Sequence, residues 1–244
     1  MGHYAILSDI HGNLTALREV LRDAERREID GVLLLGDLID YGMRSNETVA
    51  YLAAWLEGKN IVCNLWGNHE RAILTGDFTR FSSPRGAASA RYTASRLSEA
   101  SVDYLTNALS HEGFQEFELE GKRCLAIHGS LEDPYWKSVF PEKVRGDYSR
   151  YDLVFSGHSH VSHMFRKFYP CDNSETRNQH AVCFINPGSV GQPRNHLPHA
   201  QYAVLDCGAM GAAMRSIPYD VGAEMALYHG EVDFFYRDRL KNGV

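Results

Sequence analysis

Short apolar runs that stop abruptly at glycine or polar residues recur along this chain, and segments with helical periodicity lie between them. In the first part of the sequence we expect strands at Tyr4–Leu7, Val32–Leu35 and Ile61–Trp66. Apolar residues from Asn13 to about Arg27 recur at the spacing of one helical face. A second helix is expected from a Ser45 cap to about Leu56. Strands that alternate with helices form βαβ units with buried, largely parallel strands, so the pattern predicts an α/β protein.

The remainder of the chain is less regular. Residues from about 87 to 109 have helical character, and residues 114–127 are expected to form a hairpin with Glu120-Gly121 as its turn. A final helix is expected from about Val221 to Leu240. The other expected strands are 153–155, 182–185, 202–205 and 214–217.

Polar clusters follow the apolar runs and carry the chemistry. In open α/β sheets the ligand crevice lies beyond the carboxyl ends of the strands, so clusters that are far apart in sequence can meet there. Carboxylate, imidazole and amide oxygen groups are ligands for divalent metals. Where a cluster has the form X-x-His, we expect extended backbone to turn both side chains to the same side. The clusters are Asp9-Ile-His11, Gly36-Asp37, Gly67-Asn68-His69-Glu70, His128-Gly129 and Gly157-His158-Ser159-His160.

These ligand types suit the hydrolysis of a phosphoester. The non-bridging oxygens of the ester carry negative charge that must be neutralised, and a water must become a nucleophile near neutral pH. Two divalent cations about 3.5–4 Å apart do both. Asp37 has two carboxylate oxygens and therefore suits a bridging position between them. The clusters predict a hydrolase with two metal ions.

The order of the clusters resembles the calcineurin-like metallophosphoesterase superfamily, whose pattern is Asp-x-His, Gly-Asp, Gly-Asn-His-Asp/Glu, His and Gly-His-x-His. The match spans Asp9 to His160, and the later segment Asn186–Arg194 is similar to the small bacterial and archaeal phosphodiesterase-like branch. The resemblance implies a four-layer α-β-β-α sandwich of two mixed sheets flanked by helices. It also implies direct attack on phosphorus by a metal-bridging hydroxide, without a covalent enzyme intermediate.

The resemblance also assigns roles to single residues. His69 would remain unligated beside the leaving group, as a proton donor or a stabiliser of developing charge, and Asp40 would orient it. Mn²⁺ is our first choice of metal, with Fe, Ni, Co and Zn as alternatives. One metal ion would be held by Asp9, His11, Asp37 and His160, and the other by Asp37, Asn68, His128 and His158.

The substrate side of the site is less defined. Phosphoprotein phosphatases of this superfamily follow the orienting Asp with an arginine, whereas this chain has Tyr41, which argues for a small substrate. Arg194 or Arg71 is expected to supply the missing positive charge. Asn13 either contacts phosphate or caps the first helix.

Further residues have alternative interpretations. Gly188–Gly191 forms either an anion-binding nest or a tight turn. We expect a single domain over residues 1–244, with a partial cap at about 81–150. Five aromatic side chains either stack on a nucleoside base or pack in the core or the cap; they are Tyr135, Trp136, Phe140, Tyr148 and Tyr151. His196 and His199 are expected at the surface, without an assigned role.

Composition narrows the class of protein. The formal net charge of −6 argues against a dedicated nucleic-acid surface. The five cysteines are odd in number and show no Cys-x-x-Cys spacing, which favours reduced thiols in the cytoplasm over a disulfide framework. The N-terminus does not have the form of a signal peptide, and no apolar run approaches the roughly 20 residues needed to cross a bilayer. No membrane association is expected.

Three functions fit the motifs. The first is a phosphodiesterase that acts on small nucleotide-like substrates. The second is a broad phosphomonoesterase or a dinucleoside polyphosphate hydrolase. The third is a binding scaffold without catalysis, which would be expected to have lost His69 or a metal ligand, and all of these residues are present. The sequence favours the phosphodiesterase.

Overall fold

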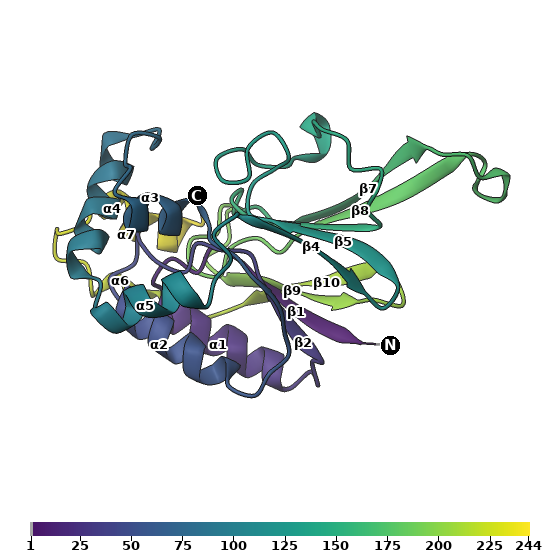
Figure 1. Cartoon of the computed structure of the whole chain (residues 1–244). Coiled ribbons are helices and arrows are strands. Elements are labelled where there is room, and N and C mark those ends of the chain that lie inside the picture. Colours follow the sequence, from purple (N-terminus) through teal and green to yellow (C-terminus); the bar gives the residue numbers. More distant parts are fainter. Residues whose placement is uncertain (1) are drawn as a thin grey trace.

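Two five-stranded mixed sheets pack face to face in the computed structural model, which describes residues 2–244 (Figure 1). The strands are β1 (His3–Leu7), β2 (Gly31–Leu34), β3 (Ile61–Asn64), β4 (Phe114–Leu119), β5 (Lys122–Ile127), β6 (Leu153–Ser156), β7 (His163–Pro170), β8 (Gln179–Asn186), β9 (Ala200–Asp206) and β10 (Gly211–Ile217). The helices are α1 (Leu14–Glu25), α2 (Ser45–Leu56), α3 (Asn68–Thr75), α4 (Pro84–Arg96), α5 (Glu99–Asn107), α6 (Val221–Met225) and α7 (Phe234–Asn242), with the 3₁₀ helices η1 (Pro141–Lys143) and η2 (Ser174–Thr176).

Each sheet contains three adjacent parallel strands. The first sheet has the order β10-β9-β1-β2-β3, with β1, β2 and β3 parallel. The second has the order β4-β5-β6-β8-β7, with β5, β6 and β8 parallel. The carboxyl ends of parallel strands lie at one edge of a sheet, so the loops that follow them can build a common site. The predicted α/β sandwich of two mixed sheets flanked by helices is confirmed.

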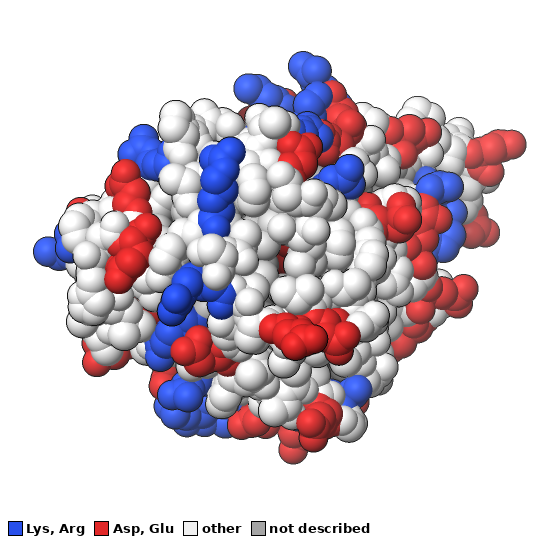
Figure 2. Space-filling model, turned by 60° about the vertical axis from the view of Figure 1, so that its left-hand side comes forward, with Lys and Arg blue, Asp and Glu red and all other residues white. Residues whose placement is uncertain are grey.

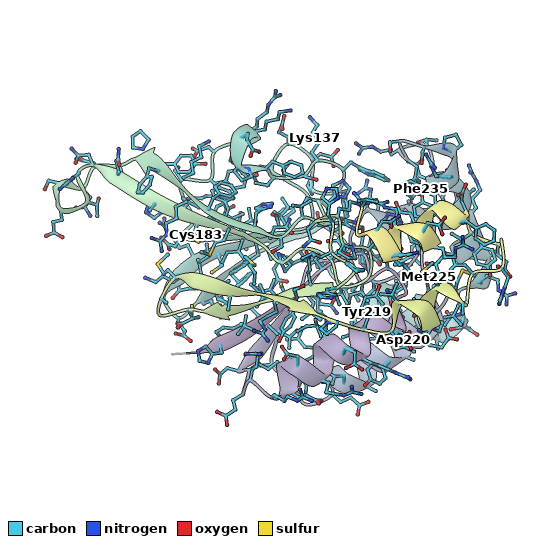
Figure 3. The ribbon with its side chains drawn as sticks, turned by 180° about the vertical axis from the view of Figure 1, so that it is seen from behind. Lys137, Cys183, Tyr219, Asp220, Met225 and Phe235 are labelled. Atoms are coloured by element: carbon cyan, nitrogen blue, oxygen red, sulfur yellow. The ribbon has the colours of Figure 1, made fainter. Side chains whose placement is uncertain are left out.

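Three apolar layers hold the sandwich together. Ile6, Leu33 and Phe155 are fully buried between the sheets, where Cys183 also lies (Figure 3). Helices α1 and α2 cover the outer face of the first sheet. The outer face of the second sheet is covered by residues 139–151, where Tyr148 is fully buried. Each such side chain contributes about 1.5–3 kcal/mol through burial, so these layers fix how the loops at the strand ends are placed.

The predicted final helix is wrong, because two short helices replace it. Helix α6 ends at Met225 and α7 begins only at Phe234. Between them Gly230 has a φ of 105°, which a helix cannot contain, and the Asp233 side chain caps α7 by accepting from Phe235 N. Figure 3 shows α6 and α7 against the rest of the molecule.

Other boundaries also differ from the sequence prediction. Strand β7 and helix α3 were not expected, and the helical segment at 87–109 is split into α4 and α5, with Ser98 as the cap of α5. The predicted cap at about 81–150 is too broad, because residues 114–127 form β4 and β5 of the second sheet. Ser45 is the first residue of α2, and its hydroxyl accepts from Asp40 N instead of capping the helix. In the described part of the chain, no helix is long and apolar enough to cross a membrane.

Candidate metal centre

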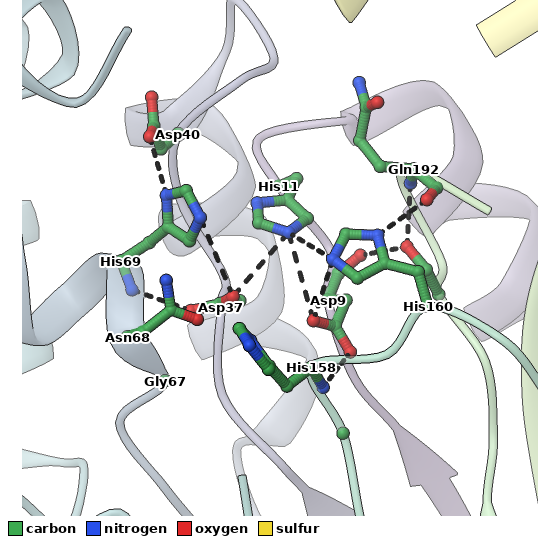
Figure 4. Close-up of polar contacts among 12 residues, drawn as sticks. Asp9, His11, Asp37, Asp40, Gly67, Asn68, His69, His158, His160 and Gln192 are labelled. Atoms are coloured by element: carbon green, nitrogen blue, oxygen red, sulfur yellow. Dashed lines mark hydrogen bonds and ion pairs between the residues drawn. The ribbon is translucent and has the colours of Figure 1, made fainter. Parts of the chain in front are cut away.

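The five polar clusters meet at the carboxyl ends of the strands, as expected. Figure 4 labels residues from four of them. Asp9 and His11 follow β1, and Asp37 follows β2, so the first sheet supplies one part of the cluster. The second sheet supplies the rest through His128 after β5 and the His158–His160 segment after β6. The proposed ligands are therefore brought together from both sheets.

The backbone of the ligand loops is left-handed. Asp9, His11, Asp37, His158 and His160 have φ angles between 50° and 62°, a region that non-glycine residues rarely adopt. The expectation that extended backbone aligns the paired side chains is wrong, although both members of each pair do reach the site. Strained residues of this kind cluster at functional sites, where the surrounding structure holds them in place.

Backbone carbonyls orient three of the histidines. His11 Nδ1 donates to Ile39 O at 3.1 Å, and His128 Nδ1 donates to Leu35 O at 2.7 Å. His160 Nδ1 donates to the carbonyl oxygen of Gln192 at 2.6 Å. Because Nδ1 carries the proton in each ring, Nε2 is free to bind a metal, which is the usual arrangement of metal-binding histidine.

The free ligand atoms converge on two carboxylates. Asp37 Oδ2 lies 3.4 Å from His128 Nε2 and 3.7 Å from His11 Nε2. Asp9 Oδ1 lies 3.2 Å from His160 Nε2. Both carboxylate oxygens are buried and have no hydrogen-bond partner in residues 2–244. Such oxygens are costly unless a cation binds them, so the donor set fits divalent metal ions.

The ligand atoms fall into two groups that share Asp37. Asp9, His11, Asp37 and His160 form one group, and Asp37, His128 and His158 form the other. Asn68 Oδ1 lies 3.1 Å from His128 Nε2, at the place expected for a further ligand of the second group. The geometry is compatible with the sequence-based assignment of each of these residues.

Burial and mutual charge set the protonation of the cluster. Burial lowers the pKa of His11 and of His160 well below the usual value, and it lowers the pKa of His158 to about 3. Burial alone would raise the pKa of Asp37, but the charge of His128 holds it well below its usual range. Burial likewise opposes protonation of His128, but Asp37 raises the pKa of that imidazole to about 9. Ionised carboxylates and neutral imidazoles bind divalent cations, and protons compete at His128.

The family assignment rests on a match along most of the chain. The sequence pattern of the calcineurin-like phosphoesterase superfamily domain matches residues 3–210. The chain belongs to this superfamily. The predicted family is thus confirmed, and so is the prediction of a metal-dependent phosphoric ester hydrolase.

Individual relatives match this chain over most of its length. An uncharacterised protein of Methanocaldococcus jannaschii is 30% identical over 230 residues, which cover 89% of this chain and 88% of that protein. The crystal structure of a metallophosphoesterase from Sphaerobacter thermophilus is similar with a TM-score of 0.74 and 25% identity, over 100% of this chain and 99% of that one. A hypothetical protein from Pyrococcus horikoshii has the same fold, with a TM-score of 0.79 and 19% identity over 100% and 99% of the two chains.

In this phosphoesterase, His69 lies beside the proposed metal ligands and is held by a network from α4. Its Nδ1 is 2.6 Å from Asp40 Oδ2, which is compatible with the orienting role that we expect for Asp40. Asp40 Oδ1 accepts from Ser89 Oγ at 2.6 Å and from Thr93 Oγ1 at 2.9 Å. Burial lowers the pKa of His69, but Asp37 and Asp40 outweigh burial and raise it. Ser89 and Thr93 were not found from the sequence, because nothing in a helical Ser-x-x-x-Thr spacing marks them.

Glu70 is a second residue that sequence reasoning left without a role. Its carboxylate accepts from Asp37 N and Gly67 N through Oε2, and from Leu38 N and Ile39 N through Oε1. It is fully buried. Glu70 therefore fixes the loop that carries Asp37, and its place in the Gly-Asn-His-Glu cluster was the available signal.

A cavity of about 250 Å³ lies beside the proposed metal ligands. Arg194 lines it together with Tyr41, and Arg194 Nε is buried without a partner in residues 2–244. Arg71 is exposed and stacks on the Tyr135 ring at 4.7 Å. Figure 2 shows red atoms of acidic residues at the bottom of a hollow in a largely white face, with blue side chains beside it.

Two other expected contacts have structural roles. Asn13 Oδ1 accepts from Ala16 N, and Asn13 Nδ2 donates to Gly191 O and Tyr219 Oη, so the structure favours the helix-cap alternative. In the Gly188–Gly191 turn, Gly191 N donates to Asp9 O. This segment is a tight turn against the β1 loop rather than an anion nest. His196 is exposed, and His199 Nδ1 lies 3.2 Å from Ser216 Oγ.

Helix α7 supports the site from outside the matched family region. The Tyr236 ring stacks on Tyr41 with centroids 4.1 Å apart, and Tyr236 O accepts from Gln192 Nε2 at 3.2 Å. Gln192 in turn orients His160 through its carbonyl. The Tyr228 hydroxyl donates to Tyr41 O at 3.0 Å. The C-terminal segment therefore fixes one wall of the cavity.

Proposed function

We propose that this protein is a phosphodiesterase that uses two divalent metal ions to hydrolyse small, nucleotide-like phosphoesters. The observation that carries the proposal is the pair of ligand groups that share Asp37, with Asp9 Oδ1 and Asp37 Oδ2 buried and unpaired at the centre. Paired metal sites of this kind serve in-line displacement at phosphorus.

The residues of the chain have separate roles in the proposed reaction. Divalent cations bound here would neutralise the charge on the ester oxygens and lower the pKa of a water. Arg194, which lines the same cavity, would bind a non-bridging oxygen. His69 would donate a proton to the departing oxygen, oriented by its hydrogen bond to Asp40.

The size of the cavity supports a small substrate. Its volume of about 250 Å³ lies below the ~300–1,000 Å³ typical of sites for drug-sized ligands. Tyr41 is buried against Tyr236 and narrows the cavity on this side. We expect a phosphopeptide to be hydrolysed much more slowly than a small diester. A phosphopeptide that outperforms every small diester would contradict the proposed size limit.

The decisive experiment is a panel of chromogenic esters assayed with several metals. Bis-p-nitrophenyl phosphate should be hydrolysed faster than p-nitrophenyl phosphate. Faster monoester hydrolysis would replace the diesterase with the phosphomonoesterase alternative. Efficient cleavage of dinucleoside polyphosphates would instead favour a dinucleoside polyphosphate hydrolase. No hydrolysis of any ester by protein that holds two metal ions would favour the non-catalytic scaffold.

We predict that hydrolysis depends on bound divalent metal ions. Chelation should abolish turnover, and Mn²⁺ should restore it. Asp37→Asn should lose more bound metal than Asp9→Asn or His158→Ala, because Asp37 belongs to both ligand groups. Elemental analysis checks both statements. Full activity in metal-free protein, or equal metal content in Asp37→Asn and wild type, would disprove them.

The cytoplasmic location stays a prediction that the five free cysteines support.

A further inference from the structure

Two loops meet over the side of the cavity where His69 lies. Arg80, from the loop between α3 and α4, donates to Asp133 Oδ2 at 2.6 Å. Asp133 Oδ1 accepts from the backbone of Tyr135 and Trp136 at 3.0 and 3.1 Å. The Phe81 ring meets the Trp136 ring edge to face, with centroids 5.2 Å apart. These contacts hold two aromatic rings in a defined position.

Phe81 and Trp136 line the cavity beside the proton donor. The Phe81 ring lies 5.1 Å from the His69 ring, and both aromatic residues belong to the cavity wall with Arg194 and the metal ligands. Both are only partly buried, whereas Tyr148 and Tyr151 from the same region are buried in the core. The two rings therefore leave aromatic surface for a ligand.

Trp136 also carries a polar atom that is unpaired in the described part of the chain. Trp136 Nε1 is buried and has no hydrogen-bond partner in residues 2–244. A buried donor without an acceptor costs free energy, and a ligand acceptor that reaches it removes this cost. The guanidinium carbon (Cζ) of Arg80 lies over the same ring, 5.4 Å from the ring centroid. Because the ion pair with Asp133 holds Arg80 in place, Arg80 restricts the movement of this ring.

We propose that Phe81 and Trp136 form a subsite for a planar heteroaromatic group on the leaving-group side of the substrate, with the chemistry of a nucleobase. The inference rests on the proposed function, because His69 defines which side the leaving group occupies. The aromatic faces stack on the ring, and Trp136 Nε1 donates to one of its acceptor atoms. Arg194 and the metal ligands lie on the phosphate side of the same cavity.

The experiment compares two ligands that share a phosphate end. Non-hydrolysable phosphonate analogues of AMP and of ribose 5-phosphate are titrated into Mn²⁺-loaded protein and followed by calorimetry. Both reach the metal ions and Arg194, and they differ only in the base. The AMP analogue should bind about tenfold more tightly, which is within the range for one base stacked on aromatic side chains.

Three variants and one control locate the effect. Phe81→Leu and Trp136→Leu keep an apolar side chain but remove the ring, and each should reduce the preference for the AMP analogue to about twofold or less. Trp136→Phe keeps a ring and removes the N–H, so it should reduce the preference by a smaller factor. Trp55→Phe, in α2 and remote from the cavity, should leave the preference unchanged.

The outcomes separate the two proposals. Equal affinity of the two analogues for wild-type protein that still hydrolyses diesters would overturn the subsite alone. An unchanged preference in both folded leucine variants would do the same. A metal-loaded protein that hydrolyses no ester and binds neither analogue would overturn the proposed function itself.

Discussion

His69 is not one of the proposed metal ligands, yet it lies beside the ligand cluster and lines the cavity. Its Nε2 lies 4.0 Å from Asp37 Oδ2, while Nδ1 is held by Asp40. Asp40 is itself fixed by two hydroxyl groups of α4. An imidazole in this position can protonate a departing oxygen without displacing a metal ligand.

Replacing His69 should therefore separate chemistry from metal binding. His69→Ala should keep both metal ions and lose roughly 10²–10⁴-fold in rate, the usual contribution of a general acid. The loss should be steep for poor leaving groups such as alkoxides and small for p-nitrophenolate. A leaving-group series with metal analysis of each protein makes the measurement. An equal loss for every leaving group would leave only electrostatic stabilisation, and loss of one metal ion would show that His69 is a ligand.

Asp40→Asn should give a weaker form of the same pattern, because the imidazole remains but its orientation and charge change. Thr93→Val removes one of the two hydroxyl donors to Asp40 and serves as a graded comparison. A plot of its log rate against the pKa of the leaving group should have a slope between those of wild type and Asp40→Asn. A Thr93→Val slope as steep as that of His69→Ala would contradict this order.

Glu70→Gln should destabilise the protein through the Asp37 loop. Four backbone N–H groups donate to the two carboxylate oxygens of Glu70. A glutamine side chain has one acceptor oxygen, so two of these N–H groups would face its NH₂ group, which is itself a donor. We expect the free energy of unfolding to fall by ~2–4 kcal/mol, measured by urea denaturation of chelated protein. Glu47→Gln, an exposed residue of α2, is the control and should change it by less than about 0.5 kcal/mol. Equal stability of the two variants would contradict the role of Glu70.

The sequence indicated the proposed ligands but not the residues that support them. Asp9, His128 and the other ligands follow apolar runs directly, so strand ends predict where they meet. Ser89 approaches Asp40 only because α4 packs over the site, a contact across 49 positions in the chain. The left-handed backbone at the ligands was also missed, since it follows from tertiary packing and not from local residue preference.

Among the elements, α1 is joined to the first sheet by an ionic contact. Asp23 of α1 accepts from Arg27 Nε at 2.9 Å and from the Tyr202 hydroxyl of β9 at 2.6 Å, and Arg215 of β10 lies 3.4 Å away. The hydrogen bond from Arg27 is the largest cause that lowers the pKa of Asp23 to about 2. The carboxylate is therefore more acidic in the folded protein than in the unfolded chain.

This contact should make stability depend on pH in the acid range. Because the folded pKa is depressed, the ionised Asp23 contributes stability above about pH 4, and this contribution is lost as the pH falls through about 2. Asp23→Asn should cost about 2 kcal/mol at pH 7, and the difference from wild type should shrink below about pH 4. Glu19→Gln, which breaks an exposed ion pair, should change stability by less than about 1 kcal/mol. A difference that does not vary with pH would contradict the ionic origin.

The elements that sequence patterns missed have weak local signals. Strand β7 is an edge strand with Arg166 and Lys167 in its middle and Pro170 at its end, so it lacks the apolar alternation of the buried strands. The residues between α6 and α7 keep helical spacing of apolar side chains, yet Gly230 interrupts the backbone. Strands buried on both faces, such as β2, have continuous apolar runs and were predicted within one or two residues.

On the scale of the whole molecule, the proposed ligands join the two sheets. Asp9, His11, Asp37 and Asn68 follow strands of the first sheet, and His128, His158 and His160 follow strands of the second. A cation bound by both sets links the sheets at one end of the sandwich. Binding to the folded state alone stabilises it by mass action.

Metal binding should therefore raise the melting temperature. With free Mn²⁺ at about 100 times its dissociation constant, we expect Tm to rise by roughly 5–10 °C over chelated protein. Asp37→Asn should show a smaller rise, because its two ligand groups are both weakened. Calorimetric scans at matched metal concentration check the comparison. An equal rise in both proteins would indicate non-specific stabilisation by the metal.

The support of the site by α7 has a consequence for biosynthesis. A nascent chain that has emerged from the ribosome as far as His160 already displays every proposed ligand, but neither Gln192 nor Tyr236 has yet emerged. Domains form progressively from the N-terminal side during translation, so the ligand loops exist before the residues that align His160 and back Tyr41. Maturation of the hydrolytic centre must wait for α7, which delays reactivity until the rest of the fold has been translated.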